Sequence, residues 1–309
     1  MDIKTEAIGR GAIKIVNSVV NIAVLTIILL SVAFAGYALW DARQIYQAAD
    51  KSNYAVYKPT VEDEGKSFQE LQALNGEVFA WLSVYGTNID YPVTQGQTNM
   101  KYVNTDAEGR YSLSGSIFLD CNNSGGFSDF NNILYGHHMT KKAMFGEIGE
   151  FAEKKMFDTH RYGNLYFDGK DHGIEFFAFI HTDAYDSMVF TPNVEQDDRP
   201  AYLDNILSKA IHKRDIGVTT EDRIILLSTC SSSSTNGRDL LVGRITDEVY
   251  ADLTTNAEIN DGKMDSQFCF VKKVYLWPIL LAILIMLRLV YILVIYHRQK
   301  QNEKIAETG

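Results

Sequence analysis

Long hydrophobic runs stand near both ends of the chain. Residues 19–40 contain no charged side chain over 22 positions. A helix of about 20 apolar residues spans the hydrocarbon core of a bilayer, so this run predicts a membrane-spanning helix. A cleaved signal peptide is the alternative, but its apolar region would be shorter and would end at a small-residue cleavage site, whereas this run continues to Trp40.

The second run, residues 274–296, is strongly apolar except for Arg288. A central arginine costs about 2.5–3.5 kcal/mol on insertion scales, and the apolar neighbours offset that cost. We interpret the run as a second membrane-spanning helix with a tolerated charge rather than a functional one.

The charges around the two runs predict their orientation. Basic side chains precede the first run and follow the second: Lys4, Arg10, Lys14, His297, Arg298, Lys300 and Lys304. Because positively charged flanks stay on the cytoplasmic side, both termini, residues 1–18 and 297–309, are predicted to be cytoplasmic. Residues 41–273 are then extracellular, and the protein is predicted to reside in the cell membrane.

Between the two runs the pattern changes to short segments. Residues 41–64 are charged and helix-compatible and predict a stalk, and residues 251–273 predict a linker. Strand-like runs rich in aromatic and β-branched residues begin at Val78: VFAWLSV, IDYPV, GSIFLD, NILYGHH, NLYF, IEFFAFIHT, RIILLSTC and LLVGRI. They predict a mainly β domain over residues 65–250, built as a closed or nearly closed barrel. Helical patterns interrupt the strands at residues 143–157 and 199–213.

Composition narrows the possible functions. A formal net charge of -10 argues against a general nucleic-acid binder, because phosphate binding needs clustered Lys and Arg. The three cysteines imply no disulfide framework. We interpret Cys121 as structural, while Cys269 could pair between chains. No CxxC or HExxH spacing occurs, so neither a metal site nor a cofactor is predicted.

Cys230 ends the apolar run RIILLSTC and precedes the polar loop SSSSTNG. A thiol at a strand end is accessible to substrate, although Cys230 taken alone is better explained as a small buried side chain that ends a strand. If RIILLSTC and RDLLVGRI are antiparallel neighbours, hairpin closure brings Arg238 near Cys230, where a guanidinium can stabilise an oxyanion. Arg244 is the alternative, but it lies about 20 Å from the turn at 3.3 Å per residue. We interpret it as a solvated strand-end charge.

His137 and His138 follow Gly136 at another strand end. Consecutive strand residues face opposite ways, so only one of the two imidazoles can point at the thiol. A histidine beside a cysteine serves as general base or acid at neutral pH. Taken alone, the pair fits an ordinary polar strand end as well.

Three motifs in this order, YGHHM at 135–139, LSTC at 227–230 and the arginine that opens RDLLVGRI, together resemble the catalytic signature of sortases. The runs at 81–104 and 115–120 resemble the class B branch. The resemblance covers residues 65–250. It implies an eight-stranded sortase-type β-barrel with N-terminal and inserted helices, flanked here by the two membrane helices.

The resemblance also implies roles for individual residues. Cys230 would be the nucleophile, His137 the proton carrier and Arg238 the oxyanion stabiliser. The residues expected to line the substrate groove are Ser228, Tyr135 and Asn99. The expected reaction cleaves a sorting motif of a secreted protein at a Thr carbonyl, forms a Cys thioester and transfers the acyl group to an amine. That amine belongs to a lipid-linked peptidoglycan precursor or a pilin subunit.

The sequence departs from the family pattern in three places. Leu226 replaces a Thr, which we interpret as a packing change on the strand. The loop between Cys230 and Arg238 is short and serine-rich, and the predicted C-terminal membrane span is more typical of pilus-building sortases. Two other classes stay open: a papain-like hydrolase, which normally carries its cysteine before its histidine, and a membrane-tethered scaffold without activity.

Overall fold

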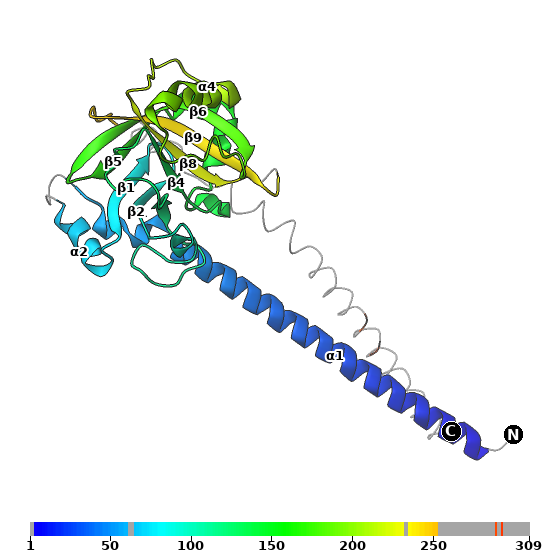
Figure 1. Ribbon diagram of the computed structural model, residues 1–309. Helices are drawn as coiled ribbons and strands as arrows, with labels where there is room; N and C mark the ends of the chain where they lie inside the picture. Colours follow the sequence, from blue (N-terminus) through cyan, green and yellow to red (C-terminus); the bar gives the residue numbers. More distant parts are fainter. Residues whose placement is uncertain (1–2, 61–64, 232–233, 253–287, 289–291, 293–309) are drawn as a thin grey trace. The chain divides into compact units, whose positions relative to one another are not determined.

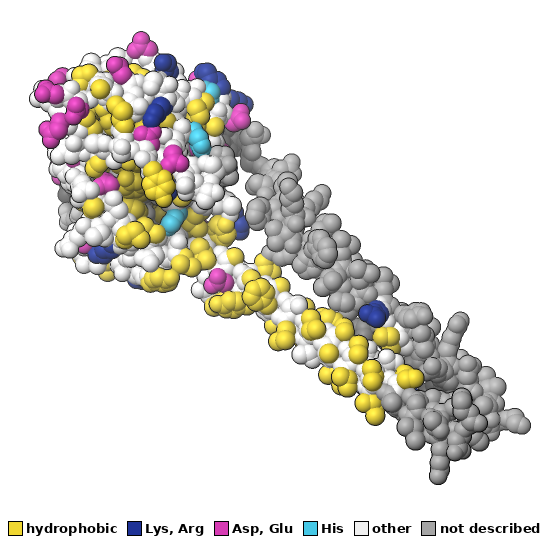
Figure 2. Space-filling model, turned by 45° about the vertical axis from the view of Figure 1, so that its right-hand side comes forward, with side chains coloured by type: hydrophobic (Ala, Val, Ile, Leu, Met, Phe, Trp, Pro, Cys, Tyr) yellow, Lys and Arg dark blue, Asp and Glu magenta, His cyan; other side chains and the backbone are white. Residues whose placement is uncertain are grey.

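The N-terminal helix α1, Ile3–Ala48, includes the first hydrophobic run. In the computed structural model it contains one segment, Ile13–Ala48, that is long and apolar enough to cross a membrane, and none of that segment's most apolar window is buried. Hydrophobic side chains accordingly cover the surface of α1 (Figure 2). Within the segment predicted as a stalk, the chain is tied to the domain, because Ala49 and Tyr54 are buried in its core.

The structure describes residues 3–60, 65–231, 234–252, 288 and 292. The chain divides into two compact units, Met1–Thr254 and Thr255–Gly309. The predicted second membrane helix, residues 274–296, lies outside the described residues except for Arg288 and Ile292.

A closed β-barrel forms the centre of the first unit (Figure 1). Its eight strands are β1 (Val78–Val84), β2 (Asp90–Thr94), β3 (Ile117–Leu119), β4 (Asn131–Tyr135), β5 (Tyr162–Phe167), β6 (Lys170–Asp183), β8 (Arg223–Cys230) and β9 (Gly237–Thr246). They follow the order β5-β1-β2-β3-β4-β8-β9-β6, and pairing between β5 and β6 closes the ring. The predicted eight-stranded barrel is therefore confirmed.

Short helices fill the connections. They are η1 (Lys51–Asn53), η2 (Ala55–Tyr57), α2 (Lys66–Leu74), η3 (Lys101–Val103), η4 (Thr140–Lys142), η5 (Ile148–Ala152), α3 (Lys154–Thr159), η6 (Gln196–Asp198) and α4 (Arg199–Lys209). Helix α2 buries Phe68 and Leu71, three residues apart on one face, in the hydrophobic core.

Two predicted helices differ from the structure. The pattern at 143–157 forms only η5 and α3. Met144 has a positive φ of 52° that an α-helix does not accommodate, and the extended backbone of Glu153 separates the two short helices. The pattern at 199–213 ends as a helix at Lys209. Its last four residues form a short ninth strand, β7 (Ala210–Lys213), because β6 offers a free edge there beyond its pairing with β5.

The two faces of the β8–β9 hairpin pack into different hydrophobic clusters. Leu226 and Leu240 belong to the cluster beneath α4, which also contains Tyr202 of that helix. Leu227 and Leu241 belong to the larger cluster that fills the barrel. Since strand residues alternate between faces, each hairpin residue can be placed on the α4 side or the barrel side.

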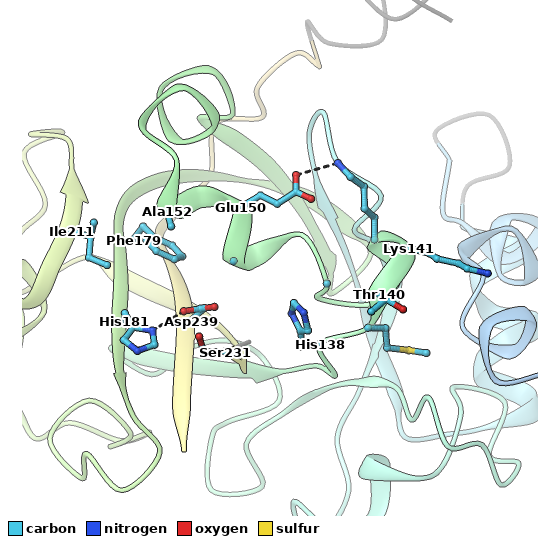
Figure 3. Close-up of a pocket in the computed structure, with 14 residues that line it drawn as sticks. His138, Thr140, Lys141, Glu150, Ala152, Phe179, His181, Ile211, Ser231 and Asp239 are labelled. Carbon is cyan, nitrogen blue, oxygen red and sulfur yellow. Dashed lines mark hydrogen bonds and ion pairs between the residues drawn. The ribbon is translucent and has the colours of Figure 1, made fainter. Parts of the chain in front are cut away.

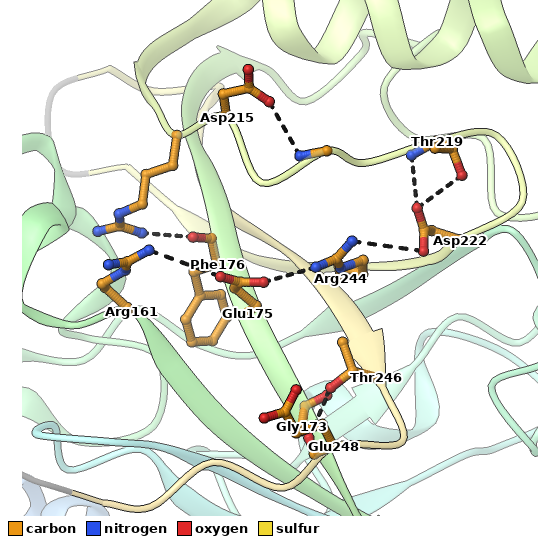
Figure 4. A network of polar contacts seen from close by, with 12 residues as sticks. Arg161, Gly173, Glu175, Phe176, Asp215, Thr219, Asp222, Arg244, Thr246 and Glu248 are labelled. Atoms are coloured by element: carbon orange, nitrogen blue, oxygen red, sulfur yellow. Dashed lines mark hydrogen bonds and ion pairs between the residues drawn. The ribbon is translucent and has the colours of Figure 1, made fainter.

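Arg244 is not the solvated charge that its position at a strand end suggested. Its side chain is 22% exposed, and Nη2 lies 2.9 Å from Glu175 Oε2. Pairing of β6 with β9 sets Glu175 directly opposite Arg244, and Asp222 extends the same network (Figure 4). The antiparallel register therefore supplies a partner that the sequence around Arg244 does not reveal.

Candidate active site

Cys230 is the last residue of β8, and its direct cross-strand partner on β9 is Arg238. The Ser231 N–H donates to the Gly237 carbonyl at 2.8 Å and closes the hairpin immediately beyond this pair. Arg238 Nη1 donates to the same carbonyl at 3.0 Å. Cys230 is exposed, so the thiol is accessible at the turn end of the hairpin.

The parallel pairing of β4 with β8 brings His137 to the same end of the sheet. The Gly136 N–H donates to the Ser228 carbonyl at 3.1 Å, and Thr229 Oγ1 donates to the Gly136 carbonyl at 2.8 Å. His137 and Cys230 each come one residue after this bonded pair. β4 and β8 run in the same direction and end at the same edge of the sheet, so the imidazole and the thiol lie on neighbouring strand ends.

Gly136 is required by close packing at this point. A Cβ added to it would lie 2.6 Å from Ile117 Cδ1 and 2.7 Å from Phe145 Cδ2. Any larger residue would push the chain that carries His137 away from the barrel. The Phe145 N–H also donates to the His137 carbonyl at 3.0 Å, so the histidine's backbone is held on both sides.

The His137 ring makes one hydrogen bond that fixes its protonation pattern. Nε2 lies 2.7 Å from the Val103 carbonyl oxygen of η3. A carbonyl only accepts, so Nε2 carries a proton in this arrangement and Nδ1 is the nitrogen left to exchange one.

Four of the six residues singled out from the sequence share the face covered by α4. Leu227 of β8 and Leu241 of β9 point into the barrel cluster. Because strand residues alternate between faces, Ser228, Cys230 and Arg238 point to the opposite face. Tyr135 is the cross-strand partner of Ser228 and packs against the cluster beneath α4. The Arg238 charge acts on the Tyr135 phenol, which agrees with a common face.

Asn99 joins this group through a residue that sequence reasoning missed. Asp120 is buried, and its Oδ2 accepts from Asn99 Nδ2 at 2.8 Å and from the Tyr135 hydroxyl at 3.0 Å. Asn99 Oδ1 in turn accepts from the Cys121 N–H at 2.7 Å. The only available signal was an acid directly after the apolar run GSIFL.

Burial raises the pKa of the Tyr135 phenol far above its ordinary value, and the Asp120 carboxylate raises it further. Tyr135 therefore stays protonated and donates to Asp120 throughout the neutral range. Its ring stacks against Phe190 at a centroid distance of 6.4 Å, which fixes the phenol in the wall. The Ser228 hydroxyl is buried with no hydrogen-bond partner among the described residues.

His138 lines a different space. A cavity of about 590 Å³ opens on the barrel side of the β8–β9 hairpin, and His138, His181 and Asp239 all contribute to its wall (Figure 3). His181 Nδ1 lies 2.8 Å from Asp239 Oδ1. The described part of the chain contains no group of three His, Cys, Asp or Glu side chains placed to hold a metal ion.

No family model matches the chain, but two proteins of one family are similar to it. It is 32% identical to sortase B of Staphylococcus aureus over 58% of this chain and 74% of that protein. It is 30% identical to sortase B of Listeria monocytogenes over 66% of this chain and 82% of that protein.

Solved structures of class B sortases are also similar to this chain. Sortase B from the type II pilus of Streptococcus pneumoniae is 47% identical, with a TM-score of 0.52 over 59% of this chain and 99% of that one. A Streptococcus pyogenes class B sortase involved in pilus biogenesis is 42% identical, with a TM-score of 0.54 over 59% of this chain and 99% of that one. The S. aureus sortase B–substrate complex is 28% identical, with a TM-score of 0.55 over 67% of this chain and 94% of that one.

Fold and relatives together define a cysteine transpeptidase that belongs to the sortase family. Within that family the chain is class B-like, as its motifs predict.

Proposed function

We propose that this sortase is anchored in the cell membrane and joins secreted proteins to an amine through a Cys230 thioester. The observation that carries the proposal is the direct pairing of Cys230 with Arg238 at the strand end next to His137. A nucleophile, a proton carrier and a cation beside one another are the groups that acyl transfer requires.

In the first half-reaction, the Cys230 sulfur attacks the carbonyl carbon of a Thr in the sorting motif. Negative charge develops on the carbonyl oxygen, and the Arg238 guanidinium stabilises it. The C–N bond then breaks, and His137 gives a proton to the departing amine. The thioester remains on Cys230.

In the second half-reaction, an incoming primary amine attacks the thioester carbon and loses a proton to His137. The C–S bond breaks and the sulfur leaves as thiolate, so the enzyme returns to its starting protonation state. Because Nε2 of His137 is bonded to the Val103 carbonyl, Nδ1 carries the proton in both steps.

We propose a pilin lysine as the acceptor amine rather than a peptidoglycan amine. The two pilus-associated sortases are 47% and 42% identical to this chain, against 28% for the S. aureus enzyme complexed with substrate. The predicted C-terminal membrane span, more typical of pilus-building sortases, supports the same choice.

Membrane attachment is supported by the apolar, unburied segment of α1. With both termini cytoplasmic, the catalytic domain would lie outside the cell, where secreted substrates arrive. The exposed Cys230 is then within reach of polypeptides tethered to the same membrane.

The test uses the full chain in neutral detergent with a library of sorting peptides and either a lysine or a triglycine acceptor, with products read by mass spectrometry. We expect new amide products, more with lysine than with triglycine. Release of free acid despite abundant amine would indicate a hydrolase. If no adduct formed on Cys230, the protein would instead be a membrane-tethered scaffold without activity.

Asp120→Asn should weaken substrate binding more than catalysis. Asn99 and Tyr135 both donate to Oδ2, while Oδ1 accepts from Asn122. An amide is uncharged and sets an NH2 group against one of these two sets of donors, so the wall loses a charge-assisted anchor. We expect KM for the sorting peptide to rise about tenfold while kcat changes less than about threefold. Steady-state kinetics measure both values.

The matched control is Asp129→Asn, since Asp129 also accepts from Asn123 and Ser124 but contacts neither wall residue. A fall in kcat with unchanged KM for Asp120→Asn would contradict a positioning role in the groove wall.

A further inference from the structure

A second cavity lies where the end of α1 meets the barrel. Its volume is about 380 Å³. It is lined by residues from the last turns of α1, the β1–β2 turn and the segment after His138: Arg43, Tyr46, Gln47, Asp50, Lys51, Asn88, Tyr91, Lys141, Lys142 and Ala143. No part of the mechanism above uses it.

The cavity is locally basic in a chain whose net charge is -10. Four of its lining residues are cationic and only Asp50 is acidic. Arg43, Lys51 and Lys141 have no carboxylate partner among the residues that the structure describes. Lys142 differs, because its Nζ lies 3.1 Å from Glu147 Oε1 and 3.0 Å from Glu150 Oε2.

The backbone is held in an unusual shape at this cavity. Lys141 and Lys142 have positive φ values of 61° and 60°. Non-glycine residues adopt this region rarely and at a cost, and such residues concentrate at ligand sites and switches. The Lys141 ammonium lies over the Tyr46 ring, 4.7 Å from its centroid, and the Tyr46 hydroxyl bonds to Thr140. These two contacts hold residues 140–142 against α1.

The cavity also lies at a definite depth along α1. Trp40 ends the uncharged run, as an interfacial aromatic does. Arg43 comes three residues later, about 4.5 Å along the helix at 1.5 Å per residue. The polar headgroup layer on each side of a bilayer is roughly 5–7 Å thick. If α1 spans the membrane, Arg43 lies in the layer that contains lipid phosphates, and Lys51 and Lys141 face that layer from the side of the domain.

We propose that this cavity binds the phosphate of an anionic phospholipid at the outer surface of the membrane, through Arg43, Lys51 and Lys141. The proposal rests on the membrane anchoring proposed above. Guanidinium and ammonium groups donate several hydrogen bonds to phosphate oxygens, and the apolar run of α1 lies beside the acyl chains. Segment 140–142 begins two residues after His138, so a bound lipid would brace the chain next to the active site.

The test titrates the full chain in neutral detergent with dihexanoylphosphatidylglycerol, and in parallel with dihexanoylphosphatidylcholine and inorganic phosphate. Binding is followed by intrinsic tryptophan fluorescence and thermal shift. We expect phosphatidylglycerol to bind at least about tenfold more tightly than either other probe. The double variant Arg43→Gln, Lys141→Gln should weaken this binding at least about tenfold.

The control double variant Lys155→Gln, Lys170→Gln removes the same charge from exposed positions of α3 and β6 and should bind as the wild type does. Equal loss in both double variants, or no preference for the anionic lipid over phosphatidylcholine, would overturn the proposal. If inorganic phosphate bound as tightly as phosphatidylglycerol, the cavity would be a site for free phosphate, and the proposal of a lipid ligand would be wrong. Transpeptidation assayed in the same detergent without lipid reports separately on the proposed function.

Discussion

Cys230→Ala should fold like the wild type and join no peptide to any amine. The thiol is exposed at the end of β8, so its removal leaves no buried cavity and should change the free energy of unfolding by less than about 0.5 kcal/mol. Loss of the nucleophile removes the covalent route altogether. We expect transpeptidation to fall by about four orders of magnitude or more, measured by mass spectrometry of the amide product.

Cys121→Ala is the matched control for this experiment. Its thiol is also free, but the backbone N–H is the group that bonds to Asn99, and alanine retains it. Activity should stay near that of the wild type. Acyl transfer that survives in Cys230→Ala but is lost in Cys121→Ala would transfer the nucleophilic role to the other thiol.

His137→Ala and His138→Ala should differ sharply although the residues are neighbours. His137 stands at the strand end beside Cys230, with Nε2 fixed by the Val103 carbonyl. Its loss would remove the proposed proton carrier from both half-reactions, and general acid–base catalysis typically contributes about 10²–10⁴-fold. We expect kcat/KM of the His137 variant to fall within or beyond that range.

His138 instead lines the cavity on the barrel side, with His181 and Asp239 (Figure 3). His138→Ala should retain kcat/KM within about threefold, and circular dichroism should show both variants folded. Inactivation by His138→Ala with an active His137→Ala would reassign the proton carrier and contradict the face assignment made from β4 and β8.

Much of the fold follows from the sequence because the barrel strands carry their own signals. Apolar runs bounded by turn residues predict β8 and β9, and their closure through a short loop predicts the pairing of Cys230 with Arg238. The helical pattern at 199–213 ends early because pairing between strands prevails over local preference. Residues 210–213 continue an amphipathic pattern, yet an open edge of β6 captures them as β7.

The polar parts of the site were harder to predict. Sequence motifs identify Cys230, His137 and Arg238, whose roles stay predictions. Asp120 carries no such signal, because its importance comes from Asn99 and Tyr135, which lie 21 and 15 residues away. Arg244 was wrongly interpreted for the same reason, since its partner Glu175 lies 69 residues away. Contacts across strands depend on register, which a single sequence does not specify fully.

The Tyr91 phenol is one of the groups that hold the end of α1 against the barrel, which bears on where a soluble fragment of this enzyme should begin. The Tyr91 hydroxyl donates to the Ala49 carbonyl at 2.9 Å and accepts from the Met144 N–H at 3.1 Å, and burial raises the pKa of Tyr91 to about 12. A fragment that starts at residue 50 lacks that acceptor and leaves the Tyr91 hydroxyl proton without its partner, at a cost of about 1–3 kcal/mol. Starting a few residues before Ala49 preserves the bond, so the two fragments should differ in melting temperature in that direction.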